Sequence, residues 1–237
     1  MRKDAVSFIV FVFLLSGGLL CTVGQARAQT KATYPAMAPL DQYLIPDKDA
    51  EIALARTAAP KSISDGAEVM VLRRSGYTTA VKGTNGFVCI VERGWDASTD
   101  DPVFWNPKNR SPICFNPAAA RTYLPLILMR TKLVLAGKSK AELVKAIATA
   151  LDKGEMPALE PGAMCYMMSK QQYLNDDALN WHPHLMFFIP GDAGKSWGAD
   201  LPGSPVMAAN DPENRLTIFM VVVATWSDGT PGPPMEH

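Results

Sequence analysis

The spacing of apolar residues along the chain predicts its first helix and its first strands. Residues 47–59 favour a helix, and Pro60 ends it because proline cannot donate a backbone hydrogen bond. Three β-rich runs follow, separated by turn residues, at 69–72, 78–81 and 87–92. Because Asn85 and Gly86 before the third run are a strong hairpin signal, we expect the three strands to form an antiparallel meander.

Helical signals dominate the middle of the chain. Asn116 and Pro117 open a helix well, because asparagine is a favoured N-cap and proline suits the first helical position. Pro125 interrupts the pattern, so we expect a short helix, a kink and a longer helix. Residues 139–142 form a capping box that predicts the start of a further helix, and Gly154 ends it.

Three further apolar runs predict strands in the second half of the chain: 163–169, 185–189 and 216–226. The last two runs are almost entirely apolar, so we expect both of their faces to be covered. Residues 94–115 show no such periodicity and are typical of a long loop. Strands, then helices, then strands again indicate an α+β fold, in which a mixed or antiparallel sheet packs against helices. The sheet would hold the N-terminal three-strand meander and three later strands.

Residues 1–28 have the three parts of a secretory signal peptide. Arg2 and Lys3 give a basic start, and residues 6–20 form an apolar run. Ala26 and Ala28 then place small residues at the −3 and −1 positions of a cleavage site. The apolar run is shorter than the roughly 20 residues that a membrane-spanning helix needs. We therefore expect export to the periplasm or the extracellular space, with cleavage near Ala28.

Composition divides residues 29–237 into a lead-in, a domain and a tail. Residues 29–46 contain three prolines and no sustained periodicity, so we expect an extended lead-in. Residues 47–228 are long enough for one sizeable core, which makes a single α+β domain the default. Residues 229–237 are rich in glycine and proline and predict a disordered tail. The sequence after the signal peptide predicts no transmembrane segment.

The charge balance argues against one class of function. The chain carries 23 basic and 23 acidic residues, and the signal peptide contains three of the basic and one of the acidic ones. Cleavage therefore leaves a net charge of −2, without the basic footprint that is typical of a nucleic-acid-binding protein. No pattern in the sequence indicates a particular cofactor, ligand or protein partner.

Cleavage also removes Cys21 and leaves Cys89, Cys114 and Cys165. An odd number of cysteines in an oxidising compartment means one bridge and a free thiol, or no bridge. Cys89 and Cys114 are the closest pair in sequence, and a bridge between them would stabilise the fold by roughly 3 kcal/mol in the chain-entropy model. The alternative, which the sequence favours equally, is that all three are small buried apolar residues.

His182 and His184 are the candidate metal ligands. Residues two apart on an extended backbone point to the same side, and Pro183 favours that geometry for His182. Two parallel imidazoles can bind a divalent metal, and Asp228 after the last strand would supply a carboxylate. The alternative is a pair of ordinary polar residues at a strand entrance beside Trp181.

A thiol site is a second chemical alternative. Cys165 would be the nucleophile if Cys89 and Cys114 are bridged, with His184 as its base. An activated thiol normally lies beside a cation or at a helix N-terminus. The apolar strand around Cys165 offers neither, which argues against this chemistry.

Four tryptophans at loop and strand ends are candidates to line a ligand pocket: Trp95, Trp105, Trp181 and Trp197. A tryptophan side chain combines a large apolar contact area with one hydrogen-bond donor, the indole N–H. This combination suits an apolar or sugar-like ligand. The alternative is that each of them caps the core beneath a long loop.

Residues 85–93 and 182–188 resemble segments of conserved hypothetical exported bacterial proteins. No function is attached to that resemblance, so it implies no residue roles. The leading hypothesis is an exported binding or interaction protein of unknown ligand, because the sequence contains no complete catalytic constellation. The competing hypotheses are a metal-dependent hydrolase or metal carrier built on His182 and His184, and a thiol enzyme built on Cys165.

Overall fold

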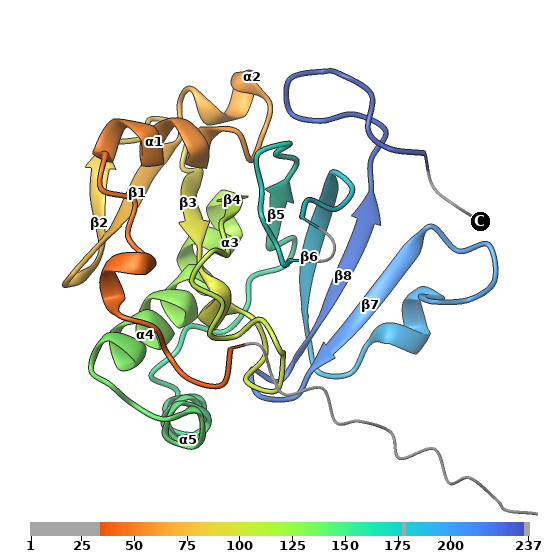
Figure 1. Cartoon of the computed structure of the whole chain (residues 1–237). Helices are drawn as coiled ribbons and strands as arrows, with labels where there is room; N and C mark the ends of the chain where they lie inside the picture. The colour runs from red at the N-terminus through yellow and green to blue at the C-terminus, as the bar shows by residue number, and fades with distance from the viewer. Residues whose placement is uncertain (1–33, 177–178, 235–237) are drawn as a thin grey trace, which may run out of the picture. The chain divides into compact units, whose positions relative to one another are not determined.

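The structure is a computed structural model that describes residues 34–176 and 179–234 (Figure 1). The predicted signal peptide, residues 1–28, lies outside the described residues and stays a prediction. The described residues form one compact unit. None of the helices in the described part of the chain combines the length and the apolarity needed to cross a bilayer.

Eight strands form one sheet in the order β2-β1-β3-β4-β5-β6-β8-β7 (Figure 1). Their bounds are β1 Glu68–Arg73, β2 Gly76–Val81, β3 Val88–Glu92, β4 Ser111–Phe115, β5 Met164–Met167, β6 His184–Pro190, β7 Val206–Asp211 and β8 Leu216–Val222. β1 and β3 pair in parallel, and every other neighbouring pair is antiparallel. The predicted α+β fold with a mixed sheet is therefore confirmed.

Within residues 34–176 and 179–234, five α-helices and three short 3-10 helices accompany the sheet. Their bounds are α1 Lys48–Arg56, α2 Lys61–Ser64, α3 Pro117–Thr122, α4 Leu124–Leu135 and α5 Lys140–Asp152, with η1 Leu40–Gln42, η2 Gly94–Asp96 and η3 Gly194–Trp197. Asn116 Oδ1 accepts the Ala119 N–H at 2.9 Å, as its predicted N-cap role requires. Ser139 and Glu142 form the predicted capping box, in which the Glu142 carboxylate accepts the Ser139 N–H at 2.8 Å.

The three N-terminal strands exist, but the prediction that they form a meander is wrong. β1 and β2 form a hairpin, whereas β3 lies on the other side of β1 and pairs with it in parallel. The turn at Asn85 does not fold back along β2, because its side-chain amide donates to Ile63 O at 2.8 Å and its neighbour Thr84 donates its N–H to Gly66 O at 2.8 Å. These contacts with the segment before β1 carry the chain across to the far side of β1.

β4 and β7 were not expected from the sequence. β4 lies inside the stretch predicted to be a loop, residues 94–115, and all five of its residues are buried. Its Pro112 disfavours a central strand, since proline cannot donate to the ladder. Within β4, only Cys114 and Phe115 pair with β5, so Pro112 lies where β4 has a single partner strand. Proline is tolerated there for that reason.

Helices cover the two faces of the sheet unequally (Figure 1). α1 packs against the face that carries Cys89, Val91 and Cys114. The helices α3, α4 and α5 pack against the opposite face, which carries Ile90 and Phe115. The helices cover less of the sheet toward β6, β8 and β7, where most side chains are only half-buried. The expectation that both faces of the last two apolar runs are covered therefore holds only in part.

Both ends of the described chain pack more closely than expected. Tyr43, in the predicted extended lead-in, is fully buried and donates its hydroxyl to Trp105 O at 2.9 Å. Residues 229–234, expected to belong to a disordered tail, instead fold back. The Gly232 N–H donates to Ala224 O at 2.8 Å and holds the segment beside the end of β8.

Cys89 and Cys114 are direct partners across β3 and β4 and form a disulfide, as one of the two sequence interpretations predicted. Cys165 is free and buried. Its neighbour Tyr166 is the partner of Cys114 in the sheet, so Cys165 itself points to the opposite face. The sheet therefore separates the free thiol from the disulfide.

We expect one thiol to react when the protein without its signal peptide is denatured and alkylated without reduction. Peptide mapping should locate the label at Cys165, because Cys89 and Cys114 are bridged. Replacing both Cys89 and Cys114 by alanine should lower the free energy of unfolding by roughly 3 kcal/mol. Labelling of all three cysteines in the unreduced protein would contradict the structure.

Candidate functional site

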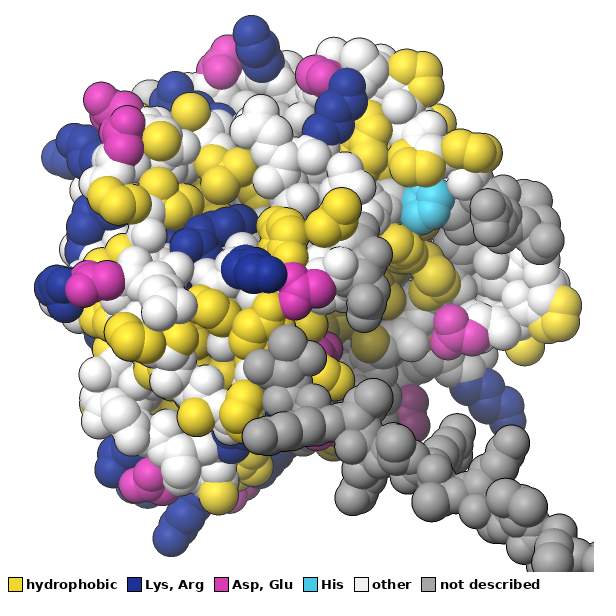
Figure 2. Space-filling model, viewed as in Figure 1, with side chains coloured by type: hydrophobic (Ala, Val, Ile, Leu, Met, Phe, Trp, Pro, Cys, Tyr) yellow, Lys and Arg dark blue, Asp and Glu magenta, His cyan; other side chains and the backbone are white. Residues whose placement is uncertain are grey.

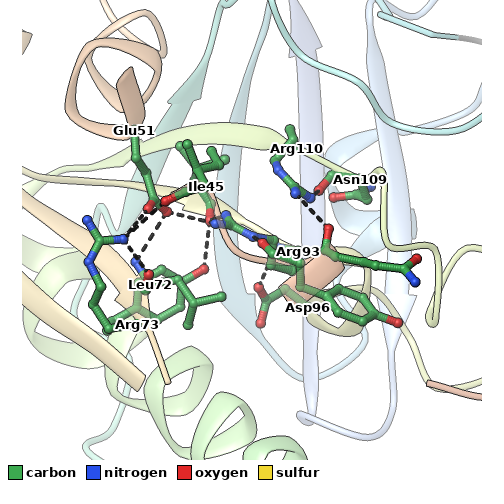
Figure 3. Close-up of polar contacts among 12 residues, drawn as sticks. Ile45, Glu51, Leu72, Arg73, Arg93, Asp96, Asn109 and Arg110 are labelled. Carbon is green, nitrogen blue, oxygen red and sulfur yellow. Dashed lines mark hydrogen bonds and ion pairs between the residues drawn. The ribbon is translucent and has the colours of Figure 1, made fainter. Parts of the chain in front are cut away.

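Arg93 lies at the centre of a buried polar cluster just after the end of β3 (Figure 3). Its Nε donates to Tyr43 O at 2.7 Å, and its Nη2 donates to Glu51 Oε1 at 2.7 Å. Its Nη1 donates to Val91 O. Every nitrogen of the guanidinium therefore has an acceptor, which is what a buried cation requires.

Glu51 on α1 is the anionic partner of Arg93 and is 0 % exposed. Its Oε1 also accepts the Leu72 N–H at 3.2 Å, and its Oε2 accepts from Arg73 Nη1 at 3.0 Å. One carboxylate therefore connects α1 to β1 and to the end of β3. Figure 3 shows the side chains of Glu51, Arg73 and Arg93 directed toward one another.

Small residues bring Glu51 close enough to the sheet to make these bonds. Glu51 and Ala55 are the buried residues of α1, and they share one face because they are four residues apart. Ala55, Ala58 and Ala59 pack against β1, β3 and β4. A helix with alanine at its contact face approaches a sheet closely. The Glu51 side chain can therefore reach β1.

Arg110 marks the outer edge of the cluster, beside Asn109 (Figure 3). It donates to Pro107 O at 2.9 Å and to Gln42 O at 3.1 Å. Burial, together with the positive charge of Arg93, lowers the pKa of Arg110 to about 10. Arg110 therefore fastens the lead-in to the loop before β4 through carbonyl groups.

Glu92 and Asp96 lie on either side of Arg93 in sequence and differ from Glu51 in their bonding. Asp96 Oδ2 accepts the Arg93 N–H at 3.0 Å, but its Oδ1 is buried and makes no hydrogen bond with a described residue. Burial raises the pKa of Asp96 to about 7. Burial and the nearby Asp96 charge raise the pKa of Glu92 well above its ordinary value. These two carboxyl groups are the most perturbed acids of the cluster.

Arg130 on α4 reaches the same region from the opposite side. It is almost fully buried, and its Nη1 donates to Ala97 O at 2.7 Å and to Trp95 O at 3.5 Å. Its Nη2 donates to Asn214 Oδ1 at 3.3 Å and contacts Glu213 Oε2 at 3.5 Å. Arg130 therefore ties η2 to the turn between β7 and β8.

A close approach of backbones fixes η2 in this position. A Cβ atom at Gly94, the first residue of η2, would lie 2.4 Å from Val103 O. Only glycine permits that distance, so η2 packs against the following loop at backbone contact. This contact fixes η2, which contains Asp96, against the loop that follows it.

The structure places the two predicted metal ligands close together but does not complete a metal site. His184 is buried, its Nδ1 lies 2.8 Å from His182 O, and its ring packs against Trp181 with centroids 4.9 Å apart. Burial lowers the pKa of His184, which favours its neutral form. Asp228 instead bonds to Thr230 and pairs with Lys170 at 3.0 Å. Residues 34–176 and 179–234 contain no group of three side chains suited to hold a metal ion.

Cys165 is inaccessible where the structure places it. It is fully buried among the apolar side chains between the sheet and α3 and α4. Burial raises the pKa of its thiol well above the ordinary value, with a further contribution from the negative charge of Glu92. Its environment is therefore that of an inert structural cysteine.

The four tryptophans do not line a common pocket. Trp95 and Trp105 belong to a buried cluster with Tyr43, and the Trp95 indole donates to Thr131 Oγ1 at 3.2 Å. Trp197 is 44 % exposed and stacks on Phe219 at a centroid distance of 4.2 Å. Trp181 lies with the histidines. The alternative interpretation, in which tryptophans cap the core, describes Trp95 and Trp105.

A cleft of about 650 Å³ lies between the ends of β7 and β8 and the returning C-terminal segment, and we call it the C-terminal cleft. It is lined by Gly203, Ser204, Pro205, Met207, Val222, Val223, Ala224, Gly232, Pro233 and Pro234. All of these residues are uncharged. The face shown in Figure 2, in contrast, carries basic and acidic side chains next to one another.

Sequence reasoning missed Glu51, Arg93, Asp96 and Arg130 as members of a buried cluster. One local signal was available, because Arg130 stands inside a helix whose other residues are mostly apolar. A charged residue in such a setting is expected to be buried and paired. No local signal connects Glu51 to Arg93, since these residues meet only in the folded chain.

No family model matches the chain, and neither a curated protein nor a solved structure matches it.

Replacing Glu51 by glutamine should destabilise the fold strongly, because it leaves Arg93 buried without its anion. Loss of one partner of a buried ion pair costs about 3 to 5 kcal/mol, measured by urea denaturation. Asp41→Asn is the matched control, because Asp41 pairs with Arg74 on the surface and such pairs contribute little. Equal effects of the two substitutions would contradict the role assigned to Glu51.

Proposed function

We propose that the protein is an exported binding protein that takes an uncharged, apolar small molecule in the C-terminal cleft. The cleft itself carries this proposal, since its volume of about 650 Å³ lies within the range of small-molecule sites. Export is part of the proposal, and the Cys89–Cys114 disulfide supports it because such bonds persist in oxidising compartments.

Two contacts hold the C-terminal wall of the cleft in place. The Gly232 N–H donates to Ala224 O at 2.8 Å. A Cβ atom at Gly232 would lie 2.9 Å from Pro183 Cγ, so glycine is needed for the segment to pack this closely. The wall is therefore preformed, which lowers the entropic cost of binding.

The lining indicates the chemistry of the ligand. Met207, Val222 and the prolines supply apolar surface. Ser204 Oγ is already engaged with Val206, whose N–H it accepts at 3.2 Å. A charged ligand would lose its hydration without gaining an opposite charge, so the cleft favours an uncharged one.

We expect the neutral fluorophore N-phenyl-1-naphthylamine to bind saturably, with a rise in its emission. Met207→Glu should weaken binding at least about tenfold, because an apolar ligand would have to desolvate the new carboxylate. Fluorescence titration measures both affinities.

Leu201→Glu is the matched control for this experiment. It introduces the same charge near β7, but Leu201 is 61 % exposed and lies outside the C-terminal cleft. Its affinity for the fluorophore should equal that of the unmodified protein. Absence of saturable binding, or equal affinities for Met207→Glu and the unmodified protein, would rule out the proposed site.

A further inference from the structure

The loop that carries η3 runs from β6 to β7 and lies beside β7 (Figure 1). Between this loop and the strands β7 and β8 is a second cleft, which we call the η3 cleft. Its volume is about 550 Å³, which suits a small molecule. It is lined by Asp192, Gly194, Lys195, Gly198, Ala199, Asp200, Leu201, Ala208, Asn210 and Thr217.

The η3 cleft and the C-terminal cleft are separate sites on opposite faces of the sheet. Ala208 on β7 lines the η3 cleft, whereas its neighbour Met207 lines the C-terminal cleft. Neighbouring residues of a strand point to opposite faces of a sheet. Among the described residues, the two linings share no member.

Hydrogen bonds within the loop and to β7 hold the wall of the η3 cleft. The Ala199 N–H donates to Gly194 O at 3.3 Å, and the Asp200 N–H donates to Val206 O at 3.0 Å. Asp200 Oδ1 also accepts the Ala208 N–H at 3.3 Å. These bonds hold Asp200 at a φ of 59°, in a region that residues other than glycine seldom adopt. The wall is therefore preformed, which lowers the cost of binding.

Charged groups of both signs line the η3 cleft without partners in the protein. Within residues 34–176 and 179–234, the Lys195 ammonium and the Asp192 carboxylate make neither a hydrogen bond nor an ion pair. The Asn210 side-chain amide makes no hydrogen bond with these residues either. In contrast, Arg215 before β8 is paired with Asp152 at 2.6 Å. The polar groups of the cleft are therefore available to a ligand.

Apolar surface adjoins these charges. Leu201 lines the η3 cleft with 61 % of its surface exposed. Ala199 and Ala208 line it as well, and their small side chains leave room beside Leu201. An apolar group of a ligand that covers Leu201 would remove apolar surface from water, which favours binding.

We propose that the η3 cleft binds a free amino acid with an apolar side chain. Such a molecule carries an ammonium and a carboxylate on one carbon atom, and Asp192 and Lys195 supply the opposite charges. The Asn210 amide adds a donor for the carboxylate. Leu201 supplies the contact for the apolar side chain. This site is additional to the C-terminal cleft, whose lining is uncharged and which takes an uncharged ligand.

Isothermal titration calorimetry with L-leucine tests the proposal on the protein without its signal peptide. Leucine should bind saturably at one site. Leucinamide lacks the carboxylate and 4-methylpentanoate lacks the ammonium, so each should bind at least about fivefold more weakly than leucine. Absence of saturable leucine binding, or equal affinity for leucine and either analogue, would overturn the proposal.

Two variants assign the charges of the ligand to residues of the η3 cleft. Lys195→Met should weaken leucine binding at least about fivefold and bring the affinities of leucine and leucinamide to within about twofold of each other. Asp192→Asn should do the same for leucine and 4-methylpentanoate. If both variants bind leucine as the unmodified protein does, the amino acid lies elsewhere and the assignment of the η3 cleft is wrong.

Lys145→Met is the matched control, because it removes the same charge from an exposed position on α5 outside the η3 cleft. Its affinity for leucine should equal that of the unmodified protein. Met207→Glu should also leave leucine binding unchanged, since Met207 lines the C-terminal cleft. Loss of leucine binding in either of these variants would contradict a separate site in the η3 cleft.

Discussion

The ion pair between Glu51 and Arg93 is the constraint on which the N-terminal half of the fold depends. Both side chains are buried; removing Glu51 would leave Arg93 without an anion, and removing Arg93 would leave Glu51 with Arg73 as its remaining cation. Through their remaining bonds they fix Tyr43 of the lead-in, Leu72 and Arg73 of β1, and Val91 of β3. The position of α1 over the sheet, and with it the cover of the Cys89–Cys114 disulfide, follows from the same pair.

Arg93 and Asp96 lie three residues apart and differ in their bonding. Arg93 has an acceptor for every nitrogen, which is typical of a structural group. Asp96 accepts the Arg93 N–H with one carboxylate oxygen, whereas its other oxygen is buried and has no donor among the described residues. Helices cover the sheet from β1 to β5, whereas the edge near β7 and β8 is less covered and contains the C-terminal cleft. The buried ion pair and the C-terminal cleft thus lie toward opposite ends of the sheet.

Local signals predicted the helix caps, because the bonds at Asn116 and Ser139 involve residues only three apart. They failed for β3, since the turn at Asn85 is local while its contacts with Ile63 and Gly66 are not. The buried cluster was missed for the same reason: Glu51 and Arg93 are far apart in sequence. The spacing of His182 and His184 suggested a metal site, but such a site needs at least one further ligand. The candidate ligand Asp228 pairs with Lys170 instead, and only the fold shows this.

A double-mutant cycle on Glu51 and Arg93 tests this account most directly. The single variants Glu51→Leu and Arg93→Met should each lower the free energy of unfolding by about 3 to 5 kcal/mol. Glu51→Leu leaves Arg93 buried without an anion, and Arg93→Met leaves the buried Glu51 with only the half-buried Arg73 as its cation. The double variant should be far more stable than the sum of these losses implies, with a coupling energy above about 2 kcal/mol. Losses that add to within about 0.5 kcal/mol would show that the two side chains act independently, and that result would contradict the account.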